Sequence, residues 1–209
     1  MTMHAWSADP FAAKPPTAPG RRLRGPGHVP GEIGIWVFIF GDMLIFAVFF
    51  GVFVYERSRA AELFEQAREH MNLAFGAGNT LLLLTGSMFV ALSLNASRHG
   101  ASVRGSRMIL VTLLCGAGFV VNKFLEYSSA IEAGHTPSTN SFYMYYFVLT
   151  GIHLLHLLLG MVALAIMYRI AGKPVLSRRD LRHLEAGACY WHLIDLLWIV
   201  LFALLYLMR

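Results

Sequence analysis

Three ionisable side chains lie in or directly before the last long apolar stretch of the sequence, which covers about residues 186–208. Glu185, His192 and Asp195 are separated by seven and three positions. On an α-helix these offsets place the three side chains on roughly one face. Because lipid cannot satisfy such groups, a stripe of this kind on a membrane-spanning helix must face protein or water.

Two other apolar stretches carry ionisable residues that could lie at the same depth. Asp42 lies about nine residues into the first stretch, and His153 and His156 lie in the fourth. With a rise of ~1.5 Å per residue, they share a layer ~9–14 Å deep with His192 and Asp195. Each such group would cost ~2.5 kcal/mol or more if it were isolated in the membrane. We therefore expect these side chains to pair with one another inside a helix bundle.

A second polar layer is expected near the opposite membrane face. Asn79, Lys123 and Glu126 fall at similar depths there. Lys123 and Glu126 have the i,i+3 spacing that allows a direct ion pair on one helix. That pair would lower the cost of placing both charges in the membrane, so their presence needs no functional explanation.

The residue types allow several chemistries for the first layer. His153 and His156 are spaced i,i+3, whereas helical zinc-binding pairs usually have the i,i+4 spacing of HExxH. Chains of Asp and His carry protons in some membrane pumps. The sequence has no GxSxG motif for a serine nucleophile. We expect structural pairing, with proton transfer or lipid contact as the alternative, and no catalytic, metal-binding or cofactor-binding residues in this chain.

The elements that position these residues follow from the composition. The chain has 209 residues, of which 56% are hydrophobic and 14% charged, whereas soluble domains have about 25% charged residues. A membrane span needs about 20 apolar residues. The sequence therefore predicts an all-α integral membrane protein, a bundle of five transmembrane helices at about residues 33–55, 73–94, 108–127, 142–168 and 186–208.

The basic residues predict the orientation of the bundle. Of the 17 lysines and arginines, twelve lie before span one, after span two or after span four, and four lie on the opposite side. The positive-inside rule then places the N-terminus in the cytoplasm and the C-terminus outside, in the periplasm. The net charge of +5 is explained by topology and contact with anionic lipid, so no nucleic-acid partner is expected.

The segments outside the spans carry less information. Residues 1–30 are rich in Pro, Gly and Arg, and we interpret them as a disordered basic tail before the membrane domain at residues 31–209. Residues 56–70 are charged and favour helix, either as a continuation of span one or as a short surface helix. Small residues within the spans, such as Gly86, Gly151 and Gly160, are typical of close packing between helices.

Five sequence stretches, one in each span and in the right order, resemble a known family. The chain is similar to subunit III of the haem-copper oxidases, cytochrome c oxidase subunit III, in its short five-helix bacterial form. The stretches that carry the resemblance are residues 34–42 (GIWVFIFGD), 79–85 (NTLLLLT), 126–127 (EY), 150–156 (TGIHLLH) with Gly160 following, and Glu185 followed by 190–198 (YWHLIDLLW).

The resemblance implies an accessory subunit in the bacterial inner (plasma) membrane that packs beside the catalytic subunit I and its companion subunits. It implies that haem and copper, or non-haem iron, lie in that partner and that phospholipid binds to this chain. Many members carry Glu at the position of Asp42, near the side of proton uptake. His153, His156, Glu185, His192 and Asp195 match positions thought to hold helices and lipid together. Longer members have two more N-terminal helices that form a lipid-filled cleft.

The branch of the family decides which reaction the partner catalyses. Residues 79–85 and Lys123 with Glu126 look more like the NorE-like branch, which is associated with nitric oxide reductase. The other interpretation is a subunit III of an oxidase that reduces O₂. A different class of function is a free-standing transporter or membrane enzyme that uses the Asp/His layer. Transport is often marked by proline-interrupted spans, and none of the eight prolines lies inside a predicted span.

Overall fold

The computed structural model describes residues 33–208, and in them the chain is entirely helical. The predicted basic tail, residues 1–30, lies outside the described residues. Five helices are long and apolar enough to cross a membrane, as the sequence predicts. The elements are α1 (Ile33–Arg59), α2 (Ala61–Glu69), α3 (Leu73–Arg98), α4 (Ser102–Glu132), α5 (Ser141–Ala171) and α6 (Arg178–Phe202), which continues as one π-helical turn, η1 (Ala203–Leu207).

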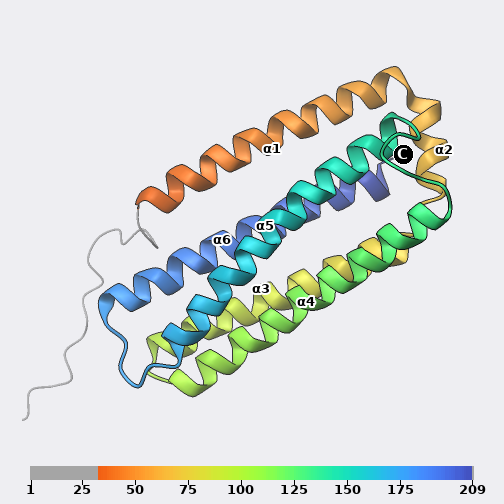
Figure 1. Ribbon diagram of the computed structural model, residues 1–209. Helices are drawn as coiled ribbons and strands as arrows, with labels where there is room; N and C mark the ends of the chain where they lie inside the picture. The colour runs from red at the N-terminus through yellow and green to blue at the C-terminus, as the bar shows by residue number, and fades with distance from the viewer. Residues whose placement is uncertain (1–32, 209) are drawn as a thin grey trace, which may run out of the picture.

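The five long helices run alternately in opposite directions (Figure 1). The start of α1, the α3–α4 connection and the α5–α6 connection lie at one end of the bundle. The short helix α2, the α4–α5 connection and the C-terminus lie at the other end. Helices α3 and α4 form a close pair, α5 and α6 lie beside this pair, and α1 lies along α5 and α6 on the far side.

Most helices are longer than the apolar stretches that predict them. The structure extends α4 from the expected 108–127 to Ser102–Glu132 and starts α6 at Arg178 instead of residue 186. Polar residues explain the added turns, because the Ser177 hydroxyl and the Asp180 carboxylate form a capping box at the start of α6. Asn140 caps α5 in a similar way. Hydropathy marks only the hydrocarbon-crossing part of each helix, so it misses these polar ends.

The core of the bundle is built around two tryptophans of α6. Trp191 and Trp198 are almost completely buried. Glycines let the neighbouring helices approach the Trp191 ring, because a Cβ atom at Gly86, Gly116 or Gly160 would lie 3.3–3.5 Å from it. At Gly151, by contrast, no atom lies within 4 Å of an added Cβ, so the expected packing role of this glycine is wrong.

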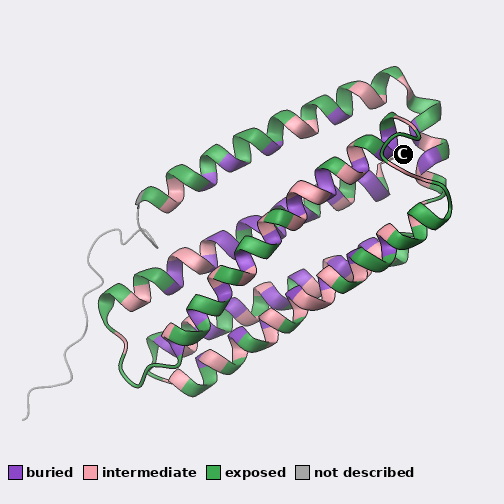
Figure 2. Ribbon diagram, viewed as in Figure 1, coloured by how far each residue is buried: buried purple, intermediate pink, exposed green. Residues whose placement is uncertain are grey.

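Helix α1 is the least buried of the five spans, as Figure 2 shows along its length. Its core contacts are made mainly by Phe46 and Phe53, which are buried against α5 and α2. The charged segment after it forms α2, which agrees with the expectation of a short helix there. Helix α1 therefore depends on a small number of contacts for its position against the bundle.

Candidate functional site

The largest polar cluster inside the bundle is centred on Lys123 of α4, which is fully buried. Its Nζ atom lies 3.0 Å from Oε2 of Glu126, the pairing that the sequence predicts. Nζ also donates to the hydroxyls of Tyr146 and Tyr206, each at 3.2 Å. Both hydroxyls in turn donate to Oε1 of Glu126. These four residues, the Lys123 cluster, join α4, α5 and η1.

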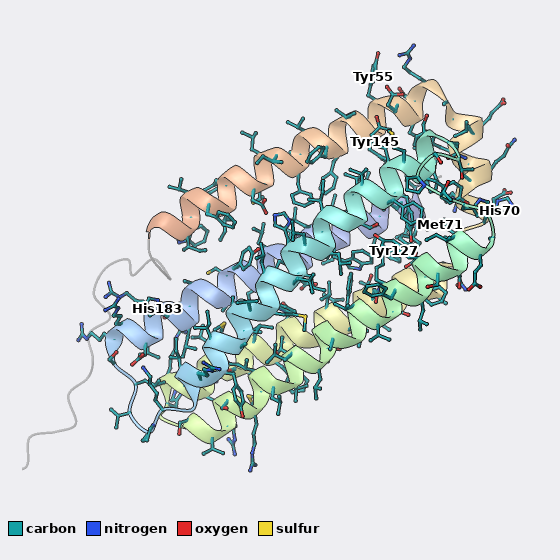
Figure 3. The ribbon with its side chains drawn as sticks, in the orientation of Figure 1. Tyr55, His70, Met71, Tyr127, Tyr145 and His183 are labelled. Carbon is teal, nitrogen blue, oxygen red and sulfur yellow. The ribbon has the colours of Figure 1, made fainter. Side chains whose placement is uncertain are left out.

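Aromatic rings surround the ammonium group of Lys123. Nζ lies 5.2 Å from the ring centroid of Tyr127, 4.7 Å from Tyr146, 5.3 Å from Trp198 and 5.8 Å from Tyr206. A ring face within about 6 Å attracts a cation. Tyr127 points from α4 toward α5, where its hydroxyl lies 2.6 Å from Oγ1 of Thr150 (Figure 3). The charge is therefore both paired and surrounded by rings, and its contacts link α4 to α5 and η1.

A second polar contact links α1 to α5. Oδ1 of Asp42 lies 3.1 Å from Nε2 of His156. Nδ1 of His156 lies 2.8 Å from the carbonyl oxygen of Ile152, and because a carbonyl only accepts, Nδ1 must carry a proton. Nε2 then either accepts a hydrogen bond from a protonated Asp42 or donates one to its carboxylate. This hydrogen bond ties α1 to α5 in the part of the core that Phe46 also fills.

His153 lies one turn from His156 but makes a different contact. It is fully buried, and its Nε2 lies 3.1 Å from the carbonyl oxygen of Ile194 on α6. Its ring packs between Phe119 and Trp198, with centroid distances of 5.6 and 5.2 Å. The expectation of a mutually paired layer therefore holds for Asp42 and His156 and is wrong for His153, which ties α5 to the backbone of α6.

The predicted polar stripe of α6 faces α3. Oε1 of Glu185 accepts from Nη2 of Arg98 at 2.7 Å. Nδ1 of His192 lies 2.5 Å from Oγ of Ser87. Asp195 is buried close to the same Ser87. The structure thus confirms a common face for the three residues, but it pairs them with α3 and not with the histidines of α5.

Asn79, which the sequence places in a layer with Lys123 and Glu126, belongs to the α3–α4 interface. Its side-chain oxygen accepts from Nδ2 of Asn122 at 2.8 Å. Asn122 also donates to the carbonyl oxygen of Phe75 at 3.0 Å. The amide pair therefore closes the contact between these two helices and stands apart from the Lys123 cluster.

Several partners in these contacts could not be recognised from the sequence. Tyr146 and Tyr206 complete the Lys123 cluster, yet tyrosines near the ends of spans are also typical of membrane interfaces. Ser87 lies in a run of small residues that indicates helix packing. Each of these residues is separated from its partner by between 20 and 105 positions, so the contact depends on which helices are neighbours.

An apolar groove of about 630 Å³ lies between α1, α5 and α6. Figure 3 shows His183 at the end of α6 that lies beside the start of α1. The lining includes Ile35 and Phe38 of α1, Met167 and Ile170 of α5, and His183 and Tyr190 of α6. The shape and apolar character suit an acyl chain. Within residues 33–208, no group of three or more His, Cys, Asp and Glu side chains could hold a metal ion.

Comparison with known proteins gives consistent matches over this whole membrane domain. The sequence model of the family "Cytochrome c oxidase subunit III" matches residues 29–209. Quinol oxidase subunit 3 of Bacillus subtilis is 30% identical over 185 residues, which cover 84% of this chain and 86% of the relative. Cytochrome c oxidase subunit 3 of Bacillus sp. strain PS3 is 31% identical over 186 residues and 84% of both chains.

A third relative comes from another bacterial group. Cytochrome bo(3) ubiquinol oxidase subunit 3 of Pseudomonas putida is 28% identical over 177 residues, again 84% of both chains. Together with the five membrane-crossing helices, these bacterial relatives make the chain a multi-pass protein of the bacterial inner membrane.

Proposed function

We propose, because this chain belongs to the cytochrome c oxidase subunit III family, that it serves as a non-catalytic accessory subunit of a respiratory haem-copper enzyme. The redox reaction takes place in the catalytic subunit I, which holds haem with copper or non-haem iron. The observation that carries the proposal is the family match over residues 29–209. The polar groups of the chain support it, since most of them link one helix to another.

The first role that we propose is stabilisation of the assembled enzyme. The Lys123 cluster joins α4, α5 and η1, and Glu185 joins α6 to α3 through Arg98. A rigid bundle of this kind can hold the adjacent surface of subunit I in place. Phospholipid contributes to the same role if an acyl chain fills the groove between α1, α5 and α6.

The second proposed role is support of proton uptake by Asp42. This carboxyl is 8% exposed and forms a hydrogen bond with Nε2 of His156. It lies toward the end of the bundle at which α1 starts, which is the cytoplasmic end if the basic residues set the orientation. A hydrogen-bonded pair near that surface can collect a proton and pass it on, whereas the enclosed Lys123–Glu126 pair lies toward the opposite end.

The proposal has two cases, which differ in the molecule that the partner enzyme reduces. Lys123 with Glu126 and residues 79–85 favour a partner that reduces nitric oxide, as in the NorE-like branch. A partner that reduces O₂ to water is the alternative, and the relatives described above are named as subunits of oxidases. A free-standing transporter is disfavoured, because Asp42 pairs with His156 while His153 and His192 bond elsewhere, so no shared substrate site forms among the described residues.

The test compares the respiratory enzyme from the native strain with the enzyme from a strain that lacks this chain. We expect the enzyme without the chain to keep its haem spectrum but to turn over more slowly or to lose activity sooner during turnover. Asp42→Asn in the intact chain should reduce proton uptake without loss of the subunit. If turnover, proton uptake and working lifetime all stayed unchanged in both cases, the proposed roles would be wrong.

A further inference from the structure

His192 is an ionisable side chain that the fold leaves exposed on a membrane-crossing helix. It lies six residues into the apolar stretch of α6, residues 186–208, which is ~9 Å inside the hydrocarbon core at ~1.5 Å per residue. Its partner Ser87 lies seven residues before the end of the apolar stretch 73–94, at a similar depth.

The surface around His192 is otherwise apolar. On α3, Leu84 and Met88 are 44% and 53% exposed. On α6, Leu196 and Ile199, one and two turns after His192, are 47% and 39% exposed. We call this surface the His192 face. It would suit lipid chains if it did not carry a polar imidazole at its centre.

Two polar atoms at this place have hydrogen-bonding capacity that the described residues do not use. The contact with Ser87 occupies Nδ1 of His192 and leaves Nε2 for a partner. One turn further along, Oδ1 of Asp195 also has no hydrogen-bond partner among residues 33–208, but this atom is buried beneath the surface, so only Nε2 of His192 is open to a partner. Polar groups within a membrane almost always face protein or water.

The other ionisable groups within the spans are not exposed as His192 is, although Oδ2 of Asp42 and Nδ1 of His153 also lack a partner among the described residues. Asp42 is bonded to His156, Lys123 to Glu126, and Glu185 to Arg98. The exposed faces of α4 and α5 carry apolar side chains such as Leu114 and Leu155, which are 65% and 57% exposed and need only lipid.

We propose that the His192 face is the surface on which this chain docks against the catalytic subunit, through a transmembrane helix that presents a hydrogen-bonding side chain to Nε2 of His192. The inference rests on the proposed function and adds the surface and the chemistry of its partner. Lipid tails cannot replace that partner, because they carry neither a donor nor an acceptor. Lipid headgroups lie too far from it.

The test uses a photo-crosslinking amino acid, benzoylphenylalanine, placed at single positions of the tagged chain in its native host membranes. Met88 and Leu196 report on the His192 face, and Leu114 and Leu155 are matched exposed controls on α4 and α5. Illumination should link positions 88 and 196 to the haem-bearing subunit, identified by mass and by its haem spectrum. The two control positions should give no such product.

The other outcomes overturn the inference in distinguishable ways. Crosslinks to the catalytic subunit only from positions 114 or 155 would move the docking surface and leave the accessory function intact. Crosslinks from 88 or 196 to a second copy of this chain would make the His192 face a homodimer contact. No crosslink from 88 or 196, while the haem-bearing subunit still co-purifies, would also reject it. If no such subunit co-purified at all, the proposed function itself would fail.

A side-chain variant measures the contribution of the imidazole. His192→Leu should weaken association with the catalytic subunit roughly three- to twentyfold, the range for one interhelical hydrogen bond in a membrane. Leu155→Ala, on the opposite control surface, should leave association unchanged. The melting temperature of each variant in detergent is measured first. Association is then compared only if the variants melt at the same temperature as the original chain, so that a loss of association reflects docking and not unfolding. Unchanged association of the His192→Leu variant would contradict the proposed hydrogen bond.

Discussion

The buried Lys123–Glu126 pair allows the sharpest prediction about stability. Glu126→Gln removes the carboxylate that lies 3.0 Å from Nζ and leaves a fully buried ammonium group with two tyrosine hydroxyls and the surrounding rings. Removing one partner of a buried ion pair typically costs about 3–5 kcal/mol. We therefore expect the free energy of unfolding of the Glu126→Gln variant to fall by about that amount.

The reverse change should cost less. Lys123→Met replaces the side chain with an apolar one, and the Glu126 carboxyl keeps two tyrosine hydroxyl donors. The expected loss is about 1–3 kcal/mol, the range for one buried polar group that loses a partner, because two hydroxyl donors still face the carboxylate. The double variant should be more stable than Glu126→Gln alone, because it contains no uncompensated buried charge.

Equilibrium unfolding in mixed micelles measures these differences in the isolated chain. Lys173→Ala is a suitable control, because its ion pair with Asp180 lies at the surface and half of the lysine side chain is exposed. That variant should unfold like the original chain. The reasoning would be refuted if Glu126→Gln were as stable as the original chain, or if the double variant lost the sum of the two single losses.

Two further predictions concern helix packing. Asp42→Asn weakens the hydrogen bond to His156, so α1 should detach more easily from the bundle. The rate of amide hydrogen exchange in α1 should rise by a factor that corresponds to about 0.6–1.7 kcal/mol, while the exchange rates of the other spans stay unchanged. Equal exchange in α1 would contradict this. Gly160→Ala places a Cβ 2.5 Å from Cδ1 of Ile194 and should cost about 1–3 kcal/mol of stability, whereas Gly151→Ala, with no atom within 4 Å, should be neutral; equal melting temperatures would refute the difference.

The sequence was sufficient to predict the five spans, because a membrane-crossing helix requires a long apolar run. It was also sufficient for the Lys123–Glu126 pair, whose i,i+3 spacing on one helix fixes the distance between the two side chains. The common face of Glu185, His192 and Asp195 followed from helical periodicity in the same way. These are properties of single helices, which depend on local spacing.

Contacts between helices were predicted less well. Depth alone put His153 and His192 in one layer with Asp42, but equal depth does not make two side chains neighbours. His153 is directed at the backbone of Ile194, and His192 at Ser87, because of how α3, α5 and α6 are rotated about their axes. Packing of bulky side chains such as Trp191 against glycines sets that rotation, and it cannot be read from the spacing within one span.

The central claim is that this chain is an accessory subunit of a haem-copper enzyme. The most direct measurement is purification of the tagged chain from its native membranes in a gentle detergent, followed by a haem spectrum and mass identification of the co-purifying chains. The account predicts a haem-bearing catalytic subunit in the eluate, and its identity decides between nitric oxide and O₂ as the acceptor. A haem-free protein that is stable without any partner would contradict the account.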